Sequence, residues 1–181
     1  MNKVFVQHSA IHGIGIFAGV GIKKGDAFLP IDDSRLVTRD NPLREDLGEC
    51  EYHCDYFIND DGKVVLMKFP ERHVNHCCSP TSYFKTLNGS RYMVALRDIA
   101  RGEEITWDYC ISRSFPNDPP WPCDCGSSRC RRMIVPDFFS LPHGLQMAYL
   151  PLLDEPFVAV YREKIETLHN RGVEATLVAT V

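Results

Sequence analysis

The feature that most constrains this chain is a run of three closely spaced cysteines, Cys123, Cys125 and Cys130, in the pattern C-x-C-x4-C. Gly126 lies inside the run and lets the backbone fold back on itself. Converging thiols suit Zn²⁺, which structural sites bind tetrahedrally through four ligands. The alternative, three uncoordinated thiols in one loop, is disfavoured because closely spaced exposed thiols oxidise. The run predicts a structural zinc site whose fourth ligand lies elsewhere, either Cys77 or Cys78.

Cysteine usage also indicates a cellular location. The chain has 181 residues, and eight are cysteine. Residues 1–8 contain too short an apolar stretch for a signal peptide, and no segment is long and apolar enough to span a bilayer. In a reducing compartment, cysteines act as metal ligands or buried thiols rather than forming disulfides. We therefore expect an intracellular, reducing location, in either nucleus or cytoplasm, and no membrane partner.

Charge narrows the class of partner. The chain has 20 Lys and Arg against 24 Asp and Glu, a formal net charge of −4. A protein that binds nucleic acid directly needs a basic face, so this balance argues against such a role. A mildly acidic surface is compatible with lysine-rich peptides.

The first 110 residues are typical of a mostly β fold, because short apolar runs alternate with turns. Asn-Gly at 88–89 and the polar stretch 59–63 predict two hairpins. Pro30 makes 28–37 an irregular or edge strand. The charged segment 43–56 is a candidate helix.

The C-terminal part has a different pattern. A proline-rich connector over 116–122 leads into the cysteine run. Apolar residues at 145, 148, 149 and 152 recur at helical spacing. A second helix is expected to begin at Pro156 and to end at Gly172. The last residues, 176–181, predict either a docked strand or a loose end.

Three further motifs carry little information when each is taken alone. Gly13-Ile14-Gly15 reads as a turn in which the backbone could approach a ligand closely. Asn75-His76 reads as a hydrogen-bonded polar pair, and 102–109 as a turn followed by an amphipathic strand.

The remaining cysteines favour structural roles. Cys50 and Cys54 lie beside His53, so a second metal site is conceivable, although ordinary thiols on a helix are favoured. Cys110 follows an apolar run and is predicted to be a core thiol.

Taken in order, the four segments resemble the SET-domain protein lysine methyltransferases followed by a post-SET zinc motif. That family has G-x-G near its start, R-F-x-N-H-S-C-x-P-N in the middle, G-E-E-L-T-x-D-Y shortly after and C-x-C-x4-C in the post-SET segment. This chain reads G-I-G, R-H-V-N-H-C-C-S-P-T, G-E-E-I-T-W-D-Y and C-D-C-G-S-S-R-C. The resemblance covers roughly residues 4–132.

The resemblance implies a fold and a division of the chain. The family's small β-sheets have a knot-like crossing where the N-H and D-Y motifs meet. The SET domain would occupy residues 1–115, the post-SET zinc segment 116–134 and a C-terminal α-helical extension 135–181. The extension would pack on the core or form a homo-oligomer interface.

The resemblance also implies a site for S-adenosylmethionine and a ligand set for zinc. Zinc would be held by Cys78 with Cys123, Cys125 and Cys130. The cofactor would contact the backbone of the glycine loop and residues of the N-H motif, namely Gly13, Ile14, Gly15, Arg72, His73, Asn75 and His76.

A substrate channel and a reaction follow from the same resemblance. A lysine of a histone-like or other protein would enter from the opposite face, and its side-chain amine would receive a methyl group beside Tyr109, the catalytic residue. Trp107 occupies a position where the family usually has Phe or Tyr, and a larger ring predicts fewer methyl groups on the product. The family's E-Y-x-G-E stretch is missing, so Tyr52 or Tyr56 would complete the channel.

Two other functions compete with this prediction. A catalytically inactive SET-like binding module would keep the fold and the zinc, and Trp107 together with the missing E-Y-x-G-E stretch favours it. The intact Asn75, His76, Asp108 and Tyr109 favour the enzyme. A zinc-dependent hydrolase is disfavoured, because the sequence shows no metal site open to water beside a carboxylate.

Overall fold

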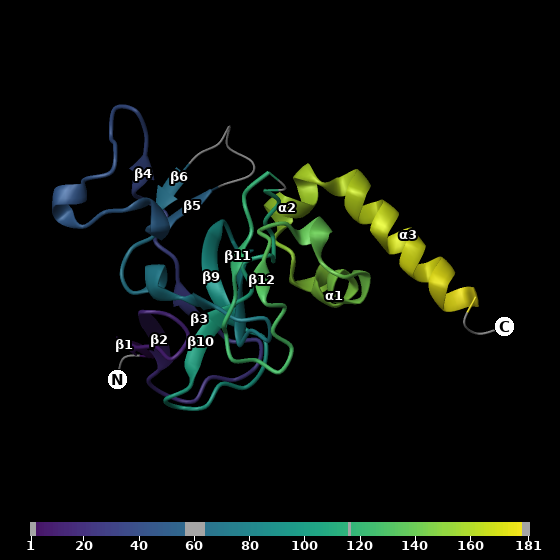
Figure 1. Cartoon of the computed structure of the whole chain (residues 1–181), viewed down its shortest axis with the longest axis horizontal. Helices are drawn as coiled ribbons and strands as arrows, with labels where there is room; N and C mark the ends of the chain where they lie inside the picture. The colour runs from purple at the N-terminus through teal and green to yellow at the C-terminus, as the bar shows by residue number, and fades with distance from the viewer. Residues whose placement is uncertain (1–2, 57–63, 116, 179–181) are drawn as a thin grey trace.

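A curled group of short strands and a group of helices form two regions of the structure (Figure 1). The structure is a computed structural model that describes residues 3–56, 64–115 and 117–178, except for the side chains of 52, 56 and 171–178. The helices are α1 (His143–Tyr149), α2 (Glu155–Val160) and α3 (Arg162–Val178). A mostly β fold with a C-terminal helical extension is confirmed.

The largest sheet has the strand order β1-β2-β10-β8-β9-β3, and β7 pairs with β10 beside this path. Its strands are β1 (Val4–His8), β2 (Ile14–Ala18), β3 (Ala27–Pro30), β7 (Asn75–His76), β8 (Ser82–Leu87), β9 (Ser90–Ala95) and β10 (Glu104–Trp107). The β8–β9 hairpin turns at Asn88 and Gly89, which both have positive φ, as the Asn-Gly pair predicts. The terminal position of β3 suits Pro30, because proline donates no hydrogen bond to a neighbouring strand.

The parallel pairing of β7 with β10 brings two distant segments of the chain together. Thr106 lies opposite Asn75 and Trp107 opposite His76. The backbone N–H of Cys77 extends the pairing by donating to the Trp107 carbonyl at 3.0 Å. The meeting of the N-H and D-Y segments that the resemblance implies is therefore present.

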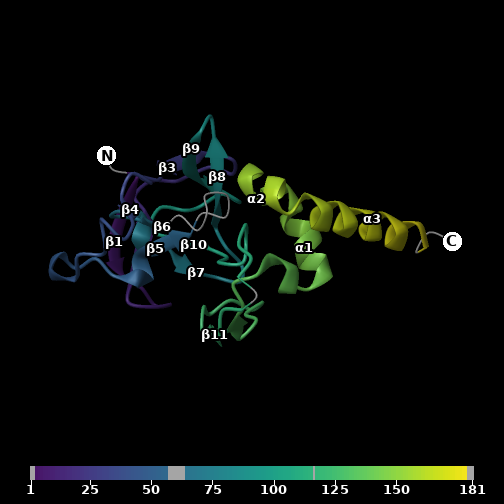
Figure 2. The same cartoon turned by 90° about the horizontal axis from the view of Figure 1, so that it is seen from above.

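Two smaller sheets flank this crossing. One consists of β4 (Leu36–Val37), β6 (Val64–Leu66) and β5 (Cys54–Tyr56), in that order. The other pairs β11 (Trp121–Pro122) with β12 (Met133–Ile134) on either side of the cysteine run. In the view of Figure 2, β7 and β10 lie between the three-stranded sheet and β11.

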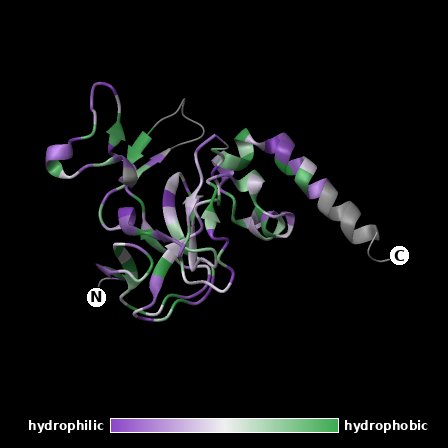
Figure 3. Ribbon diagram, in the orientation of Figure 1, coloured by the Kyte–Doolittle hydropathy of each residue, from purple (hydrophilic) through white to green (hydrophobic). Residues whose placement is uncertain are grey.

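Two apolar cores correspond to the two regions. The first lies within the large sheet and includes Ile16, Met93 and Ile105, which are fully buried. The second joins the helices to the strands and includes Cys110, Phe138, Tyr149, Leu153 and Phe157, with η4 (Phe138–Ser140) and η5 (Leu150–Leu152) contributing. Hydrophobic residues gather where the helices meet the strands, whereas the first turns of α3 are largely hydrophilic (Figure 3).

The helix expected over 43–56 is wrong. That segment forms two short 3₁₀ turns, η1 (Glu45–Leu47) and η2 (Glu51–His53), followed by β5. Gly48 ends η1 with a φ of 74°. The buried Glu49 carboxylate binds Arg35 at 2.6 Å and Arg44 at 2.5 Å. These ion pairs favour a compact loop, because they require Glu49 to point inward, away from solvent.

The helix stop expected at Gly172 is also wrong, since α3 continues to Val178. One glycine costs a helix only about 1 kcal/mol, so it does not end a helix by itself. The end predicted for 176–181 begins inside α3, and its last residues, 179–181, lie outside the described residues. The hairpin turn predicted at 59–63 lies outside them too, although β5 and β6 pair antiparallel on either side of it.

Candidate functional site

Four thiols converge beside the β7–β10 crossing. The Sγ atoms of Cys78, Cys123, Cys125 and Cys130 all lie within 4.8 Å of one another, and no other such group of three or more His, Cys, Asp or Glu ligands occurs among the described residues. The Cys123 Sγ atom is 3.8 Å from that of Cys78 and 3.7 Å from that of Cys130. Zn–S bonds of about 2.3 Å in a tetrahedron require S···S separations of about 3.8 Å. The donor set therefore fits zinc.

Hydrogen bonds from the protein surround these sulfur atoms. The Arg131 N–H lies 3.3 Å from the Cys78 Sγ atom, and the Cys78 N–H lies 3.5 Å from that of Cys125. Burial opposes ionisation of Cys125, but the N–H groups of Cys78 and Ser127 prevail and lower the pKa of its thiol to about 7. Such donors stabilise thiolates, the form that binds a metal.

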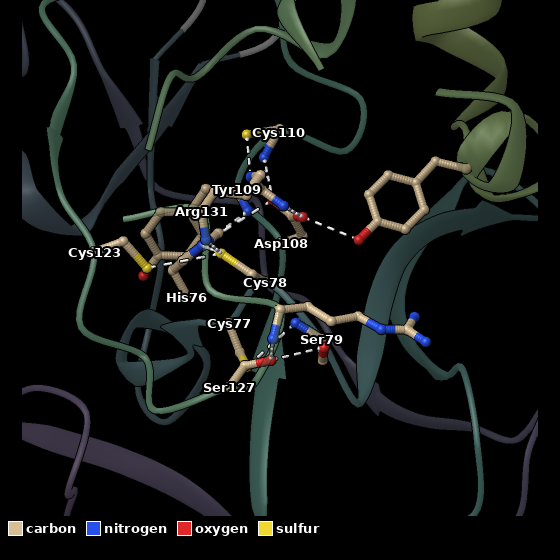
Figure 4. A network of polar contacts seen from close by, with 12 residues as sticks. His76, Cys77, Cys78, Ser79, Asp108, Tyr109, Cys110, Cys123, Ser127 and Arg131 are labelled. Carbon is tan, nitrogen blue, oxygen red and sulfur yellow. Dashed lines mark hydrogen bonds and ion pairs between the residues drawn. The ribbon is translucent and has the colours of Figure 1, made fainter. Parts of the chain in front are cut away.

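His76 links the cysteine group to the D-Y motif (Figure 4). Its Nδ1 accepts the Tyr109 backbone N–H at 3.1 Å, so the ring proton resides on Nε2, which lies 3.3 Å from the Cys78 Sγ atom. Burial lowers the pKa of His76 to about 4, so the ring is neutral at pH 7. The neutral ring can therefore bridge a metal ligand and the backbone at Tyr109.

The glycine loop is held by the Asn75 side chain. Its amide donates to the carbonyls of His12 and Ile14, at 3.1 and 3.2 Å, and to Glu104 Oε1 at 2.9 Å. Ser9 donates to the same carboxylate oxygen at 2.8 Å. A Cβ atom on Gly15 would collide with this carboxylate oxygen, so a side chain there would displace Glu104 from Ser9 and Asn75.

The Tyr109 phenol also lies at the β7–β10 crossing. Its hydroxyl donates to the Val74 carbonyl at 2.8 Å, and its ring packs against His76 and Trp107, each with centroids 5.2 Å away. Burial raises the pKa of Tyr109 to about 12. The phenol therefore stays protonated at neutral pH, and its oxygen lone pairs can accept a hydrogen bond.

Asp108 connects three parts of the chain (Figure 4). Its fully buried carboxylate binds the Arg131 guanidinium through two bonds of 2.7 and 2.8 Å, and it accepts the Tyr149 hydroxyl of α1 at 3.0 Å. Burial opposes ionisation, but Arg131 lowers the pKa of Asp108. The D-Y motif, the cysteine run and the helical extension therefore share one carboxylate.

The other predicted site residues lie nearby. Arg72 and His73 form η3 (Glu71–His73), which immediately precedes β7. The His73 ring packs against His53, with centroids 5.6 Å apart, on the side of the three-stranded sheet. Trp107 is buried beside Tyr109. Tyr52 lies in η2 and Tyr56 in β5, but their side chains are outside the described residues.

The other cysteines have structural surroundings. The Cys50 Sγ atom lies 3.2 Å from His53 Nδ1, and the Cys54 thiol points to the Cys50 carbonyl. Cys110 is fully buried, as predicted, and donates to the Val135 carbonyl at 2.9 Å.

Sequence reasoning missed several residues of the site, namely Ser9, Glu104, Arg131 and Tyr149. Glu104 belongs to the G-E-E-I-T motif, and Arg131 directly follows Cys130, so adjacency to known motifs was a usable signal. No signal in the sequence pointed to the role of Tyr149, because the spacing of this residue indicated only a buried helix face.

Comparison with known proteins identifies the family. The family described as SET domain matches residues 13–110, more than half of the chain. The chain is 34% identical over 142 residues to "Histone-lysine N-methyltransferase trithorax" of Drosophila melanogaster and 36% identical over 148 residues to "Histone-lysine N-methyltransferase 2B" of Homo sapiens. It is 31% identical over 139 residues to "Histone-lysine N-methyltransferase, H3 lysine-4 specific" of Aspergillus fumigatus.

These alignments cover 74%, 74% and 72% of this chain but only 4%, 5% and 11% of the three relatives. The chain therefore spans a small part of the curated relatives that it matches. The family match includes the glycine loop, the N-H segment and the D-Y segment, which the structure gathers at one strand crossing. The chain belongs to the SET-domain family.

Proposed function

We propose that this chain transfers a methyl group from S-adenosylmethionine to the side-chain amine of a lysine in a protein substrate. The observation that carries the proposal is the convergence of the glycine loop, Asn75, His76 and Tyr109 at the β7–β10 crossing. The named relatives are histone-lysine methyltransferases, so we take a histone tail as the first substrate to test.

The cofactor site would comprise Gly13, Ile14, Gly15, Arg72, His73, Asn75 and His76. When bound, S-adenosylmethionine supplies an electrophilic methyl group on a sulfonium. The Asn75 amide binds the carbonyls of His12 and Ile14 and thereby orders the loop around Gly13. The cofactor is thus predicted to bind where glycine permits close approach.

The lysine amine must be neutral to accept a methyl group. A channel lined by Trp107 and Tyr109, with Tyr52 and Tyr56 proposed as further walls, would lower the pKa of the lysine by desolvation. The Tyr109 hydroxyl donates a hydrogen bond to the Val74 carbonyl, so the lone pairs of its oxygen can accept an N–H of the amine and align it. With a pKa of about 12 the phenol is protonated at neutral pH and does not act as the base, so the amine proton would leave to water. Alignment of two reactants is worth about 7–11 kcal/mol in well-oriented systems.

Zinc would be held by Cys78, Cys123, Cys125 and Cys130 as a structural ion. Four thiolates leave no open coordination position, so the ion would order the loop rather than take part in chemistry. We propose the division into a SET domain (1–115), a post-SET segment (116–134) and a helical extension (135–181). The bond between Tyr149 and Asp108 supports an extension that packs on the core, while oligomer formation through it stays a prediction.

We expect a lysine-containing protein as substrate, no direct nucleic-acid partner and no membrane partner. Among the described residues, no helix combines the length and apolarity needed to cross a bilayer. The relatives' names favour the nucleus within the intracellular location predicted above.

The test uses labelled S-adenosylmethionine and histone H3, with zinc-replete protein. Tyr109→Phe should reduce label transfer at least tenfold, about 1.4 kcal/mol in activation free energy, because the aligning oxygen is lost. Tyr161→Phe removes a hydroxyl from the helical extension and is the matched control. Equal labelling by both variants would exclude the catalytic role of Tyr109. Cofactor uptake in calorimetry without any transfer would instead support the inactive binding module.

A further inference from the structure

A guanidinium group covers one face of Trp107. The Arg113 Cζ atom lies 4.6 Å from the centroid of the indole ring and 5.9 Å from that of Tyr109. Phe84 meets the same indole edge to face, with centroids 4.3 Å apart. Trp107 is therefore held between an aromatic ring and a planar cation, and stacking of this kind is a favourable cation–π geometry.

Ion pairs hold the Arg113 guanidinium in place. Arg113 binds Asp55 Oδ1 at 2.5 Å, and the other oxygen of that carboxylate binds Arg91 at 2.7 Å. Arg91 also binds Asp33 at 2.7 Å. Asp55 belongs to β5, so the three-stranded sheet determines where the Arg113 guanidinium lies. The side chains of Arg91, Asp55 and Arg113 are all at least four-fifths buried, and charges in such surroundings stay paired.

A small empty space adjoins this arrangement. A cavity of about 60 Å³ is lined in part by Phe84, Trp107, Ser112, Arg113 and Phe157, which is room for no more than a few water molecules. Two buried donors, Trp107 Nε1 and Arg113 Nε, have no hydrogen-bond partner in the described structure. The indole therefore has space beside it and no hydrogen bond to retain it, so its contacts with Phe84, Tyr109 and Arg113 hold it in place.

We infer that Arg113 is a positioning residue that clamps Trp107 and thereby limits how many methyl groups the target lysine can carry. The inference rests on the proposed function. A large ring restricts the channel only if it cannot swing aside, and the cavity would accept part of a displaced indole. Arg113 removes that freedom, so the wild-type product is expected to be mainly monomethyl-lysine.

The test compares product ratios by mass spectrometry. Arg113→Met keeps an unbranched chain but loses the planar cation, and it should raise the ratio of dimethyl- to monomethyl-lysine about three- to tenfold, the range expected for loss of one cation–π contact. Asp55→Asn weakens the support of Arg113 and should shift the ratio in the same direction by less. Arg97→Met, at an exposed arginine paired with Glu103, is the matched control and should keep the wild-type ratio.

Fluorescence quenching tests the contact between Arg113 and Trp107 without any methyl transfer. The chain has two tryptophans, so Trp121→Phe leaves Trp107 as the sole indole fluorophore. In that background Arg113→Met should increase quenching of Trp107 by acrylamide, and Arg97→Met should not. An unchanged quenching constant overturns the inference whether or not methyl transfer occurs. Abundant trimethyl-lysine from the wild-type chain also overturns it, whereas absence of cofactor uptake in calorimetry would count against the proposed function alone.

Discussion

Arg131, which follows the cysteine run, and Tyr149 of the helical extension both bind Asp108, yet the cysteine group and the extension are stabilised in different ways. Among the described residues, the buried cluster around Cys78, Cys123, Cys125 and Cys130 adds only Cys77 and Ile134, and β11 pairs with β12 on either side of the cysteine run. The extension has a core of Phe138, Tyr149, Leu153, Phe157 and Leu168, with stacked aromatic neighbours. With the proposed zinc bound, the first region depends on metal–ligand bonds and the second on apolar burial, so the two should respond to different perturbations.

Removal of zinc should have the largest effect on stability, and this effect should be confined to the cysteine loop. Structural zinc contributes about 10–16 kcal/mol in small zinc-dependent domains, because the binding free energy becomes folding free energy. Chelation or Cys123→Ser should therefore disorder the cysteine loop and abolish cofactor binding while the helices stay folded. Hydrogen exchange resolved by peptide would show both responses. Full protection of the loop after complete chelation would contradict the prediction.

Shortening a core side chain of the extension should have the opposite effect: it should destabilise the helices and leave the cysteine loop intact. Phe157 is 2% exposed and contacts three aromatic rings, those of Phe138, Phe139 and Tyr161. Phe157→Ala should lower the free energy of unfolding by about 4 kcal/mol through lost burial and the cavity that remains. Zinc content, measured by atomic absorption on the folded fraction, should be unchanged. Val160→Ala, at an exposed position on the same helix, should be nearly neutral.

The contribution of Asp108 to the free energy of unfolding should depend on pH in the acid range. Because Arg131 holds the pKa of this buried carboxyl below its ordinary 3.8, its stabilisation is fully present above that value and is lost as the pH falls below it. Asp108→Asn should cost about 3 kcal/mol at neutral pH, since Arg131 is left without its partner. Denaturant titrations from pH 7 to pH 3 should find a shallower pH dependence in this variant. Equal slopes in the two proteins would contradict the assignment.

The smallest effect is expected where the two regions touch. Tyr149→Phe removes only the hydroxyl that donates to Asp108, and it should cost about 1 kcal/mol of unfolding free energy. Combined with Asp108→Asn in a double-mutant cycle, it should cost less than the sum of the two single changes. Strict additivity would show that the extension is not energetically coupled to the D-Y motif.

The sequence predicted which motifs lie together better than it predicted the loops around them. Cys78, rather than Cys77, lies with the three thiols of the C-x-C-x4-C run, where the family resemblance placed it. The crossing that joins Asn75 to Thr106 was likewise expected from the family resemblance. The loop at 43–56 was misread because its charged residues match a helical surface, whereas Glu49 turns inward to meet Arg35 from another part of the chain. Local pattern does not report such a partner.

Residue order alone determined the strand-rich character, the grouping of Cys123, Cys125 and Cys130, and the family, because these depend on spacing and residue type along short stretches. Tertiary structure alone decided that Arg131 and Tyr149 share Asp108, that Glu104 lies against the second glycine, and that Arg113 stacks on Trp107. Each of these contacts joins groups whose chemistry permits many partners. Only the folded backbone selects one of them, since it brings that one within bonding distance and removes the water that would otherwise compete.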